Sequence, residues 1–228
     1  MLGPDGRGWV TPDAASKAVQ QPAALLLRRL RWASLGVPYN WTARSYETHA
    51  ACRPVPRCIA QRAAALAAAL NPPGAPPLRG DAALVNFYAT GDALGGHVDD
   101  AEAAAASPLV AFSLGCAAVF LLGGAGRDQP PTPLLLRGGD AVLLGGAARA
   151  AMHGLTRVLT PADVWTPQRA ATAAQDALAA VRAAGGDEAQ AVAAWMQHTR
   201  CNISVRDVYA SAADAPLLQQ AGAGRALD

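Results

Sequence analysis

The chain has 228 residues, of which 52% are hydrophobic and 16% are charged, and its formal net charge is +2. So small a net charge is not typical of a protein that binds nucleic acid through a broad basic surface. The four cysteines have no C-x-x-C spacing and no apolar run is long enough to span a bilayer, which argues against a zinc site, a disulfide framework and a membrane partner. With no targeting signal visible, we expect an intracellular protein of a reducing compartment.

Residues 1–81 are expected to form helices followed by an aromatic segment. Residues 13–34 have a helical pattern that Pro22 either divides or restarts. The segment from Trp32 to Tyr46 (WASLGVPYNWTARSY) changes character, because aromatic residues and turn formers dominate it. Residues 56–70 are again predicted to be helical, with a following run of Asn, Pro and Gly that ends the helix.

From residue 82 the pattern changes to short runs of apolar residues that Gly, Pro and Asp separate, which is typical of β-strands in an antiparallel sandwich or barrel. The predicted strands cover residues 82–90, 108–115, 117–123, 132–137 and 140–146. The pattern favours an α+β fold, in which helices buttress a β-sandwich.

The last part of the chain is predicted to contain two helices and a final strand. An Ala-rich helix covers about 168–184, and Asp187 can cap a second helix that ends near residue 198. The final strand is TRCNISVRDV (199–208), and residues 211–228 are expected to form a loose tail.

The segment LGGHVDDAE (94–102) places a histidine beside a cluster of acids, directly after two glycines. In an extended chain His97 and Asp99 point to the same side. Such a pair, with one further protein ligand, forms the facial triad of non-haem Fe(II) oxygenases. The candidates for that ligand are His49, His153 and His198. His153 is favoured because it closely follows a predicted strand, and the alternative to a metal site is a polar surface loop.

Two predicted strands carry polar residues on one face. In the final strand, Arg200, Asn202, Ser204 and Arg206 alternate with apolar neighbours, and in the strand 82–90, Asn86 and Tyr88 share one face. Arginine binds carboxylates in a bidentate manner, so these faces favour a common pocket for a small dianion. The alternatives are an ordinary half-exposed strand and a core tyrosine.

Taken together, these motifs resemble the AlkB family of Fe(II)- and 2-oxoglutarate-dependent dioxygenases. The matching motifs are NFY (86–88), HVD (97–99), SLGCAAVFLLGG (113–124), GGDAVLLGGAARAAMH (138–153) and RCNISVR (200–206). RWASLGVPYNW (31–41) and FLLGGAGRDQPPT (120–132) are similar to the eukaryotic homologue-one branch of that family, and the resemblance covers about residues 28–210.

The resemblance implies a site and a fold. The implied iron ligands are His97, Asp99 and His153, the implied contacts of the distal carboxylate of 2-oxoglutarate are Arg200, Asn86 and Tyr88, and those near its metal-chelating end are Asn202 and Arg206. The implied fold is a double-stranded β-helix, or jelly roll, over residues 82–210, with a helical insertion at about 160–198.

The resemblance also implies oxidative demethylation of N-methylated nucleobases, which are N6-methyladenine in DNA, 1-methyladenine in tRNA or both. Dioxygen and 2-oxoglutarate are consumed, formaldehyde and succinate are released, and unpaired or bubble structures are preferred, because a base inside a duplex cannot reach a buried metal. The implied setting is the nucleus or the mitochondrion, and we expect a monomer. The rivals are an oxygenase of a protein or small molecule, and a catalytically silent nucleic-acid-binding module.

The expected substrate contacts lie in three places. The aromatic segment is expected to form a nucleotide-recognition lid, in which Tyr39, Trp41 and Tyr46 stack on bases. The arginines expected to contact phosphates are Arg28 and Arg31. Bacterial AlkB has a second aspartate two residues after its ligand aspartate, whereas this chain has Ala101 there and Glu102 as the next acid. Glu102 is therefore the acidic candidate for substrate recognition, and base preference is not transferred from the bacterial enzyme.

Overall fold

The computed structural model describes residues 8–10, 20–22, 27, 29–50, 52–124, 126, 128–184 and 187–214, and the chain divides into two units, Met1–Trp32 and Ala33–Asp228. In the described part of the first unit, β1 (Gly8–Val10) pairs with β2 (Gln20–Pro22) in an antiparallel ladder. Residues 20–22 form a strand where the sequence predicts a helical pattern that Pro22 divides or restarts, and Pro22 lacks the N–H that a continuing helix requires. Residues 13–19, 23–26 and 28 of the predicted helical range lie outside the described residues. Residues 33–81, which the sequence grouped with the N-terminus, belong to the second unit.

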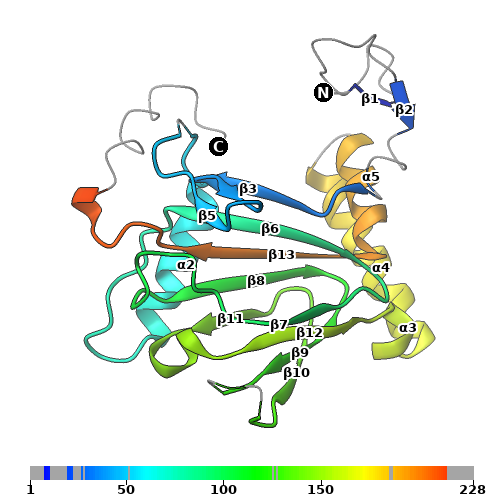
Figure 1. Cartoon of the computed structure of the whole chain (residues 1–228). Coiled ribbons are helices and arrows are strands. Elements are labelled where there is room, and N and C mark those ends of the chain that lie inside the picture. Colours follow the sequence, from blue (N-terminus) through cyan, green and yellow to red (C-terminus); the bar gives the residue numbers. More distant parts are fainter. Residues whose placement is uncertain are drawn as a thin grey trace. The chain divides into compact units, whose positions relative to one another are not determined.

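A five-stranded sheet, counted over the described residues, has the order β11-β8-β13-β6-β3 (Figure 1). Its strands are β3 (Trp32–Gly36), β6 (Ala82–Ala89), β8 (Leu109–Gly115), β11 (Ala141–Leu144) and β13 (Thr199–Arg206). The predictions for the last four are confirmed. β3 contradicts the predicted helix again, because pairing at the edge of the sheet overrides the weak local helical preference.

The other large sheet has the order β10-β9-β12-β7 within the part of the chain that is described, and all its pairs are antiparallel. Its strands are β7 (Leu94–His97), β9 (Ala118–Leu122), β10 (Thr132–Leu136) and β12 (His153–Val158). The predicted strands that became β9 and β10 are confirmed, whereas β7 and β12 were not predicted. The molecule thus combines helices with antiparallel sheets.

Helix α2 (Arg57–Leu70), confirmed where residues 56–70 were predicted, covers one face of the five-stranded sheet and lies behind it in Figure 1. The core between them contains Ala63 and Ala67 of the helix and Val110 and Val205 of the sheet. Small alanines let the helix approach closely, and burial of the apolar side chains stabilises the packing. Since side chains alternate along a strand, the polar residues of β13 are left for the opposite face.

A short hairpin, β4 (Tyr39–Asn40) and β5 (Ser45–Tyr46), follows β3. Its Tyr46 packs with Val37, Ala82, Val208 and Tyr209 in a second buried cluster. The hairpin is therefore anchored to both the start of β6 and the segment after β13.

Helices α3 (Pro161–Val164), α4 (Pro167–Ala184) and α5 (Asp187–Met196) connect β12 to β13, and the two predicted helices are confirmed as α4 and α5. The connection begins and ends at one place. Gly91 donates its backbone N–H to the carbonyl of Val158, and Thr90 donates to the carbonyl of His198.

The remaining described elements are short 3-10 turns, Gly146–Ala150 and Ala212–Asp214. Most of the predicted tail, residues 215–228, lies outside the described residues. None of the helices that the structure describes has the length and apolar character needed to cross a membrane.

Candidate active site

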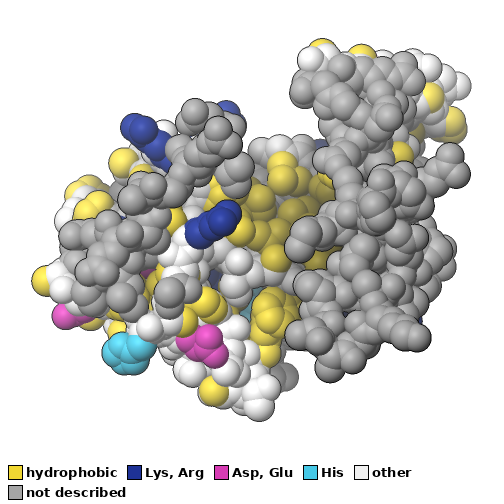
Figure 2. Space-filling model, turned by 90° about the horizontal axis from the view of Figure 1, so that it is seen from above, with side chains coloured by type: hydrophobic (Ala, Val, Ile, Leu, Met, Phe, Trp, Pro, Cys, Tyr) yellow, Lys and Arg dark blue, Asp and Glu magenta, His cyan; other side chains and the backbone are white. Residues whose placement is uncertain are grey.

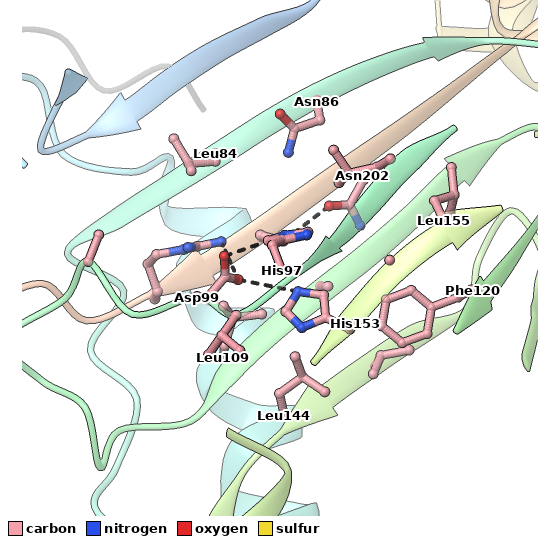
Figure 3. Close-up of a pocket in the computed structure, with 18 of the residues that line it drawn as sticks. Leu84, Asn86, His97, Asp99, Leu109, Phe120, Leu144, His153, Leu155 and Asn202 are labelled. Carbon is pink, nitrogen blue, oxygen red and sulfur yellow. Dashed lines mark hydrogen bonds and ion pairs between the residues drawn. The ribbon is translucent and has the colours of Figure 1, made fainter. Parts of the chain in front are cut away.

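A pocket of about 420 Å³ is lined by residues from both large sheets and from the hairpin. From β6 and β13 come Asn86, Tyr88, Arg200, Asn202, Ser204 and Arg206, and from the second sheet and the loop after β7 come His97, Asp99, Phe120 and His153. Figure 3 shows the apolar Leu109, Leu144, Leu155 and Phe120 around the two histidines. The pocket therefore has a polar floor within largely apolar walls, which is the usual character of a small-molecule site.

His97, Asp99 and His153 form a cluster whose candidate ligand atoms all lie within 4.8 Å of one another. The register of the sheet creates it, because His153 at the start of β12 lies directly opposite His97 at the end of β7. The Nε2 atoms of both histidines are 3.8 Å from oxygens of Asp99. His49 and His198 belong to no such cluster among the described residues.

Both imidazole rings are held by backbone carbonyls. Nδ1 of His97 lies 3.0 Å from the carbonyl oxygen of Gly95, and Nδ1 of His153 lies 3.1 Å from that of Ala151. A carbonyl can only accept, so each Nδ1 is the protonated nitrogen and each Nε2 offers a lone pair to the cluster. Burial lowers the pKa of His153, which favours the neutral ring that a metal requires.

Asp99 is kept ionised by its neighbours. Burial alone would raise the pKa of Asp99, but the positive charge of the Arg206 guanidinium outweighs burial and lowers it. Arg206 Nη2 is 3.3 Å from Asp99 Oδ2. Two neutral imidazoles and one carboxylate on one side of a pocket fit a divalent iron with open coordination positions.

Arg206 also belongs to a buried network around Glu102. Arg206 Nη1 donates to Glu102 Oε1 at 2.7 Å, Arg149 Nη2 donates to Oε2 at 2.9 Å, and the Tyr46 hydroxyl donates to Oε1 at 3.2 Å. Burial opposes ionisation of Glu102, yet Arg206 lowers its pKa overall. Both oxygens of this carboxylate are therefore occupied.

Arg200, at the other end of β13, is 1% exposed and donates from Nη2 to the Ser113 hydroxyl at 2.8 Å. Its Nε and Nη1 are buried and have no hydrogen-bond partner among the described residues. Burial lowers the pKa of the guanidinium, which means that its charge lacks full compensation. A carboxylate in the pocket would supply the missing acceptors.

The register between β13 and β6 places further polar side chains near Arg200. Tyr88 lies opposite Arg200, and Asn86 lies opposite Asn202. Burial raises the pKa of Tyr88 to about 12, so its phenol keeps its proton at neutral pH and can donate a hydrogen bond. Asn202 is oriented by the Phe112 carbonyl, which accepts from its Nδ2, and by the Ser204 hydroxyl, which donates to its Oδ1. The donor set fits the dianion 2-oxoglutarate.

Two of the three aromatic residues predicted to contact the substrate line the pocket, and the third does not. Tyr39 and Trp41 line the pocket, and Trp41 is 45% exposed. Tyr46 does not line the pocket, because its ring is 8% exposed in the core and its hydroxyl is bonded to Glu102. The structure therefore does not place Tyr46 where a base in the pocket could stack on it.

The remaining three candidates also differ from one another. Glu102 lines the pocket, but it is 5% exposed and its carboxylate is occupied by protein groups. Arg31 is exposed and belongs to the first unit, so nothing places it near the pocket. Arg28 lies outside the described residues.

Two arginines were not singled out from the sequence. Arg149 is 6% exposed and donates to the carbonyls of Ser107 and Asp99 as well as to Glu102, so it joins the loop after β7 to the segment before His153. Its signal in the sequence is that no other charged residue lies between Asp140 and His153. Arg44 lines the pocket from the hairpin turn, and no spacing pattern marks it.

Residues 5–206 match the model of the 2OG-Fe(II) oxygenase superfamily. The DNA N(6)-methyladenine demethylase ALKBH1A of Arabidopsis thaliana is 44% identical over 138 residues, which are 60% of this chain and 40% of the relative. The nucleic acid dioxygenase ALKBH1 of Mus musculus is 33% identical over 84% of this chain and 49% of its own length. This chain thus spans about half the length, or less, of these relatives.

A solved structure titled "The structure of OsALKBH1" has a TM-score of 0.55 at 24% identity, with 77% of each chain covered, and supports the likeness at the level of the fold. The sequence relatives extend the resemblance to the AlkB family and its homologue-one branch. The matched range contains the His97–Asp99–His153 cluster and the whole of β13. The chain belongs to the 2OG-Fe(II) oxygenase superfamily.

Proposed function

We propose that this protein is an Fe(II)- and 2-oxoglutarate-dependent dioxygenase that oxidatively demethylates N-methylated nucleobases. The observation that carries the proposal is one pocket that joins the His97–Asp99–His153 cluster to the buried, incompletely paired guanidinium of Arg200. A metal-ligand set and an anion-binding group in one pocket are what a metal-dependent enzyme with a dicarboxylate co-substrate needs.

The fold belongs to the same proposal. We infer that the two antiparallel sheets that line the pocket are the halves of a double-stranded β-helix. The superfamily match and the likeness to the OsALKBH1 structure support this inference. A jelly roll encloses a pocket between its sheets, in agreement with the lining residues.

The residues have separate tasks. His97, Asp99 and His153 would hold the iron. When bound, the iron would supply oxidation of the methyl C–H bond by dioxygen at the expense of 2-oxoglutarate, with release of formaldehyde, succinate and carbon dioxide. Arg200, Tyr88 and Asn86 bind the distal carboxylate of the co-substrate. Asn202 and Arg206 lie toward its metal-chelating end, and Arg206 keeps Asp99 ionised. The apolar walls limit access of water.

The substrate is proposed to be N6-methyladenine in DNA or 1-methyladenine in tRNA, in an unpaired strand. The names of the relatives support a nucleic acid, and the Arabidopsis relative is named for N6-methyladenine. Tyr39 and Trp41 line the pocket, where a base can stack on them. A flipped or unpaired base fits this arrangement, because the candidate metal ligands line a pocket that a base stacked within a duplex cannot enter.

The test is a nucleoside mass balance by mass spectrometry. The protein is incubated with Fe(II), 2-oxoglutarate and oligonucleotides that carry single methylated bases, with a control that lacks 2-oxoglutarate. We expect loss of one methylated nucleoside that depends on 2-oxoglutarate and is abolished by Asp99→Ala or His97→Ala. The matched variant His198→Ala, which changes an exposed histidine outside the cluster, should retain activity.

Each other outcome rejects a part of the proposal. Succinate formation without loss of any methylated nucleoside would reject the nucleobase substrate and favour an oxygenase of another substrate. Nucleic-acid binding without any succinate would reject the enzyme and favour a binding module. Activity that survives Asp99→Ala would reject the metal cluster.

A further inference from the structure

The turn of the hairpin at the pocket mouth contains a backbone conformation that an arginine rarely adopts. Arg44 has φ 53°, in the left-handed region, and it is the one non-glycine residue with positive φ in the described part of the chain. Such a conformation is unfavourable for a residue with a Cβ atom, and unfavourable backbone conformations gather at functional sites. The position therefore needs an explanation.

The turn is held from both sides. Asn40 Oδ1 accepts hydrogen bonds from the backbone N–H groups of Thr42 and Ala43, and Asn40 Nδ2 donates to Glu47 Oε1 at 2.9 Å. Tyr39 and Tyr46 pair across the hairpin, and their ring centroids are 5.0 Å apart. The surrounding contacts thus fix the turn in the conformation that carries Arg44.

The Arg44 side chain lines the pocket together with Trp41. The other two arginines of the pocket wall have anionic or hydroxyl partners, which are Asp99 and Glu102 for Arg206 and Ser113 for Arg200. Arg44 has no ion pair or hydrogen bond within the described structure, not even with Asp100, an exposed acid of the same pocket. The turn therefore presents an exposed cation at the entrance beside a partly exposed indole.

We propose that Arg44 binds the backbone phosphate of the nucleotide whose base enters the pocket, while Trp41 stacks on a base. This inference rests on the proposed function and names the group that anchors its substrate. When a base enters a closed pocket, its phosphates stay at the entrance, where a guanidinium can bind two oxygens at once. With a net charge of only +2, affinity for nucleic acid depends on a few well-placed cations.

Basic and hydrophobic side chains lie near one another on the face drawn in Figure 2. Tyr39 supports Trp41, because their rings meet edge to face with centroids 4.9 Å apart. An aromatic platform next to a cation is the combination that binds single strands without reading their sequence.

The experiment measures binding of a fluorescein-labelled single-stranded DNA 12-mer with one central N6-methyladenine, by fluorescence anisotropy at several salt concentrations. We compare wild type, Arg44→Gln, Arg44→Lys and the matched control Arg62→Gln, which changes an exposed arginine on α2 that does not line the pocket. Glutamine and lysine are unbranched at Cβ like arginine, so these substitutions do not change the free-energy cost of the left-handed backbone conformation at position 44. Arg44→Gln should weaken binding about tenfold at low salt and reduce the slope of log K against log salt by about 0.7. Arg62→Gln should stay close to wild type. Arg44→Lys should keep the wild-type salt slope because it keeps the charge, but its affinity should fall between those of wild type and Arg44→Gln, because an ammonium group cannot bind two phosphate oxygens as a guanidinium does.

A second probe identifies the phosphate. A 12-mer in which the phosphates flanking the methylated base are replaced by neutral methylphosphonates should bind wild type more weakly, but should bind Arg44→Gln as well as the normal 12-mer does. Equal losses in both proteins would overturn the proposal, as would an unchanged salt slope in Arg44→Gln. Demethylation of the 12-mer by wild type is followed in parallel. If it is absent, the proposed function fails, whereas normal demethylation with an unaltered Arg44→Gln variant rejects only the role of Arg44.

Discussion

The buried arginines at the two ends of β13 have different partners. Arg206 and Arg200 lie six residues apart on the same face of one strand, and both are almost fully buried. Arg206 contacts the carboxylates of Asp99 and Glu102. Arg200 contacts the neutral hydroxyl of Ser113, and two of its nitrogens have no partner among the described residues.

This difference separates a scaffold from a binding site. The charge of Arg206 is balanced within the protein by Asp99 and Glu102, so Arg206 fixes the positions of these two carboxylates beside the candidate metal ligands. The charge of Arg200 is not balanced, and an unpaired buried charge is costly unless a ligand supplies the counter-charge. The same residue type on the same strand thus has two tasks, which the partners distinguish.

The largest loss of stability should come from replacing Arg206, the arginine whose charge the protein balances. Arg206→Met leaves Asp99 without its cation and Glu102 with one arginine fewer, so we expect the free energy of unfolding to fall by about 3–5 kcal/mol. Urea unfolding of the metal-free protein measures it. Arg200→Met should not destabilise this form, because the substitution removes an uncompensated charge. Equal losses in the two variants would contradict the distinction between the two ends.

The next effect concerns binding rather than stability. Arg200→Met should weaken 2-oxoglutarate binding about 100-fold, since two charge-assisted hydrogen bonds are lost. Titration calorimetry with Mn(II) in place of Fe(II) gives the affinity directly. The control is Arg137→Met, which changes an exposed arginine that does not line the pocket. A normal affinity in Arg200→Met would remove Arg200 from the co-substrate site.

A smaller loss of stability is expected at Arg149. Arg149→Met leaves Glu102 with Arg206 as its one remaining arginine partner and leaves the carbonyls of Asp99 and Ser107 without this donor, so we expect the free energy of unfolding to fall by about 2 kcal/mol. Because Arg149 joins the loop of one metal ligand to the segment before another, Mn(II) affinity should also fall. Unaltered metal affinity in a destabilised variant would limit Arg149 to a structural role.

The smallest loss of stability is expected at Tyr46, which belongs to the hydrogen-bond network around Glu102. Tyr46→Phe removes one of three donors to Glu102, and we expect a loss of about 1 kcal/mol in urea unfolding. Tyr39→Phe is the matched control, since the structure describes no hydrogen bond from the Tyr39 hydroxyl. A loss as large as that of Arg206→Met would show that the network depends on Tyr46 as much as on its arginines.

The alternation along β13 could be predicted from the sequence, because period two is a local property of a strand. The strands with runs of Val, Leu, Ile and Phe were predictable for the same reason. β7 was missed because Gly95 and Gly96 have low strand preference, and only pairing with β12 makes this segment a strand. Residues 20–22 and 32–34 show the opposite error, in which local helical pattern was overruled by pairing.

The candidate site was predictable as a set of residues but not as an arrangement. The motif at His97 and Asp99 is local, whereas the position of His153 opposite His97 is set by register between β7 and β12, two strands that the sequence did not predict. The burial of Tyr46 and the balance around Glu102 depend on contacts between residues more than 50 positions apart. Arg44 escaped notice because its signal is a backbone angle.

The helical connection between β12 and β13 has a consequence for how such a protein can change. Both its ends are tied to the adjacent residues Thr90 and Gly91, so about forty residues leave the sheets and return to the same point. A segment of this kind can be lengthened, shortened or exchanged by recombination while the strands before and after it keep their register. The strands that carry the proposed site and the helical connection are therefore free to evolve at different rates, and the connection can acquire new surfaces while the pocket between the sheets is kept.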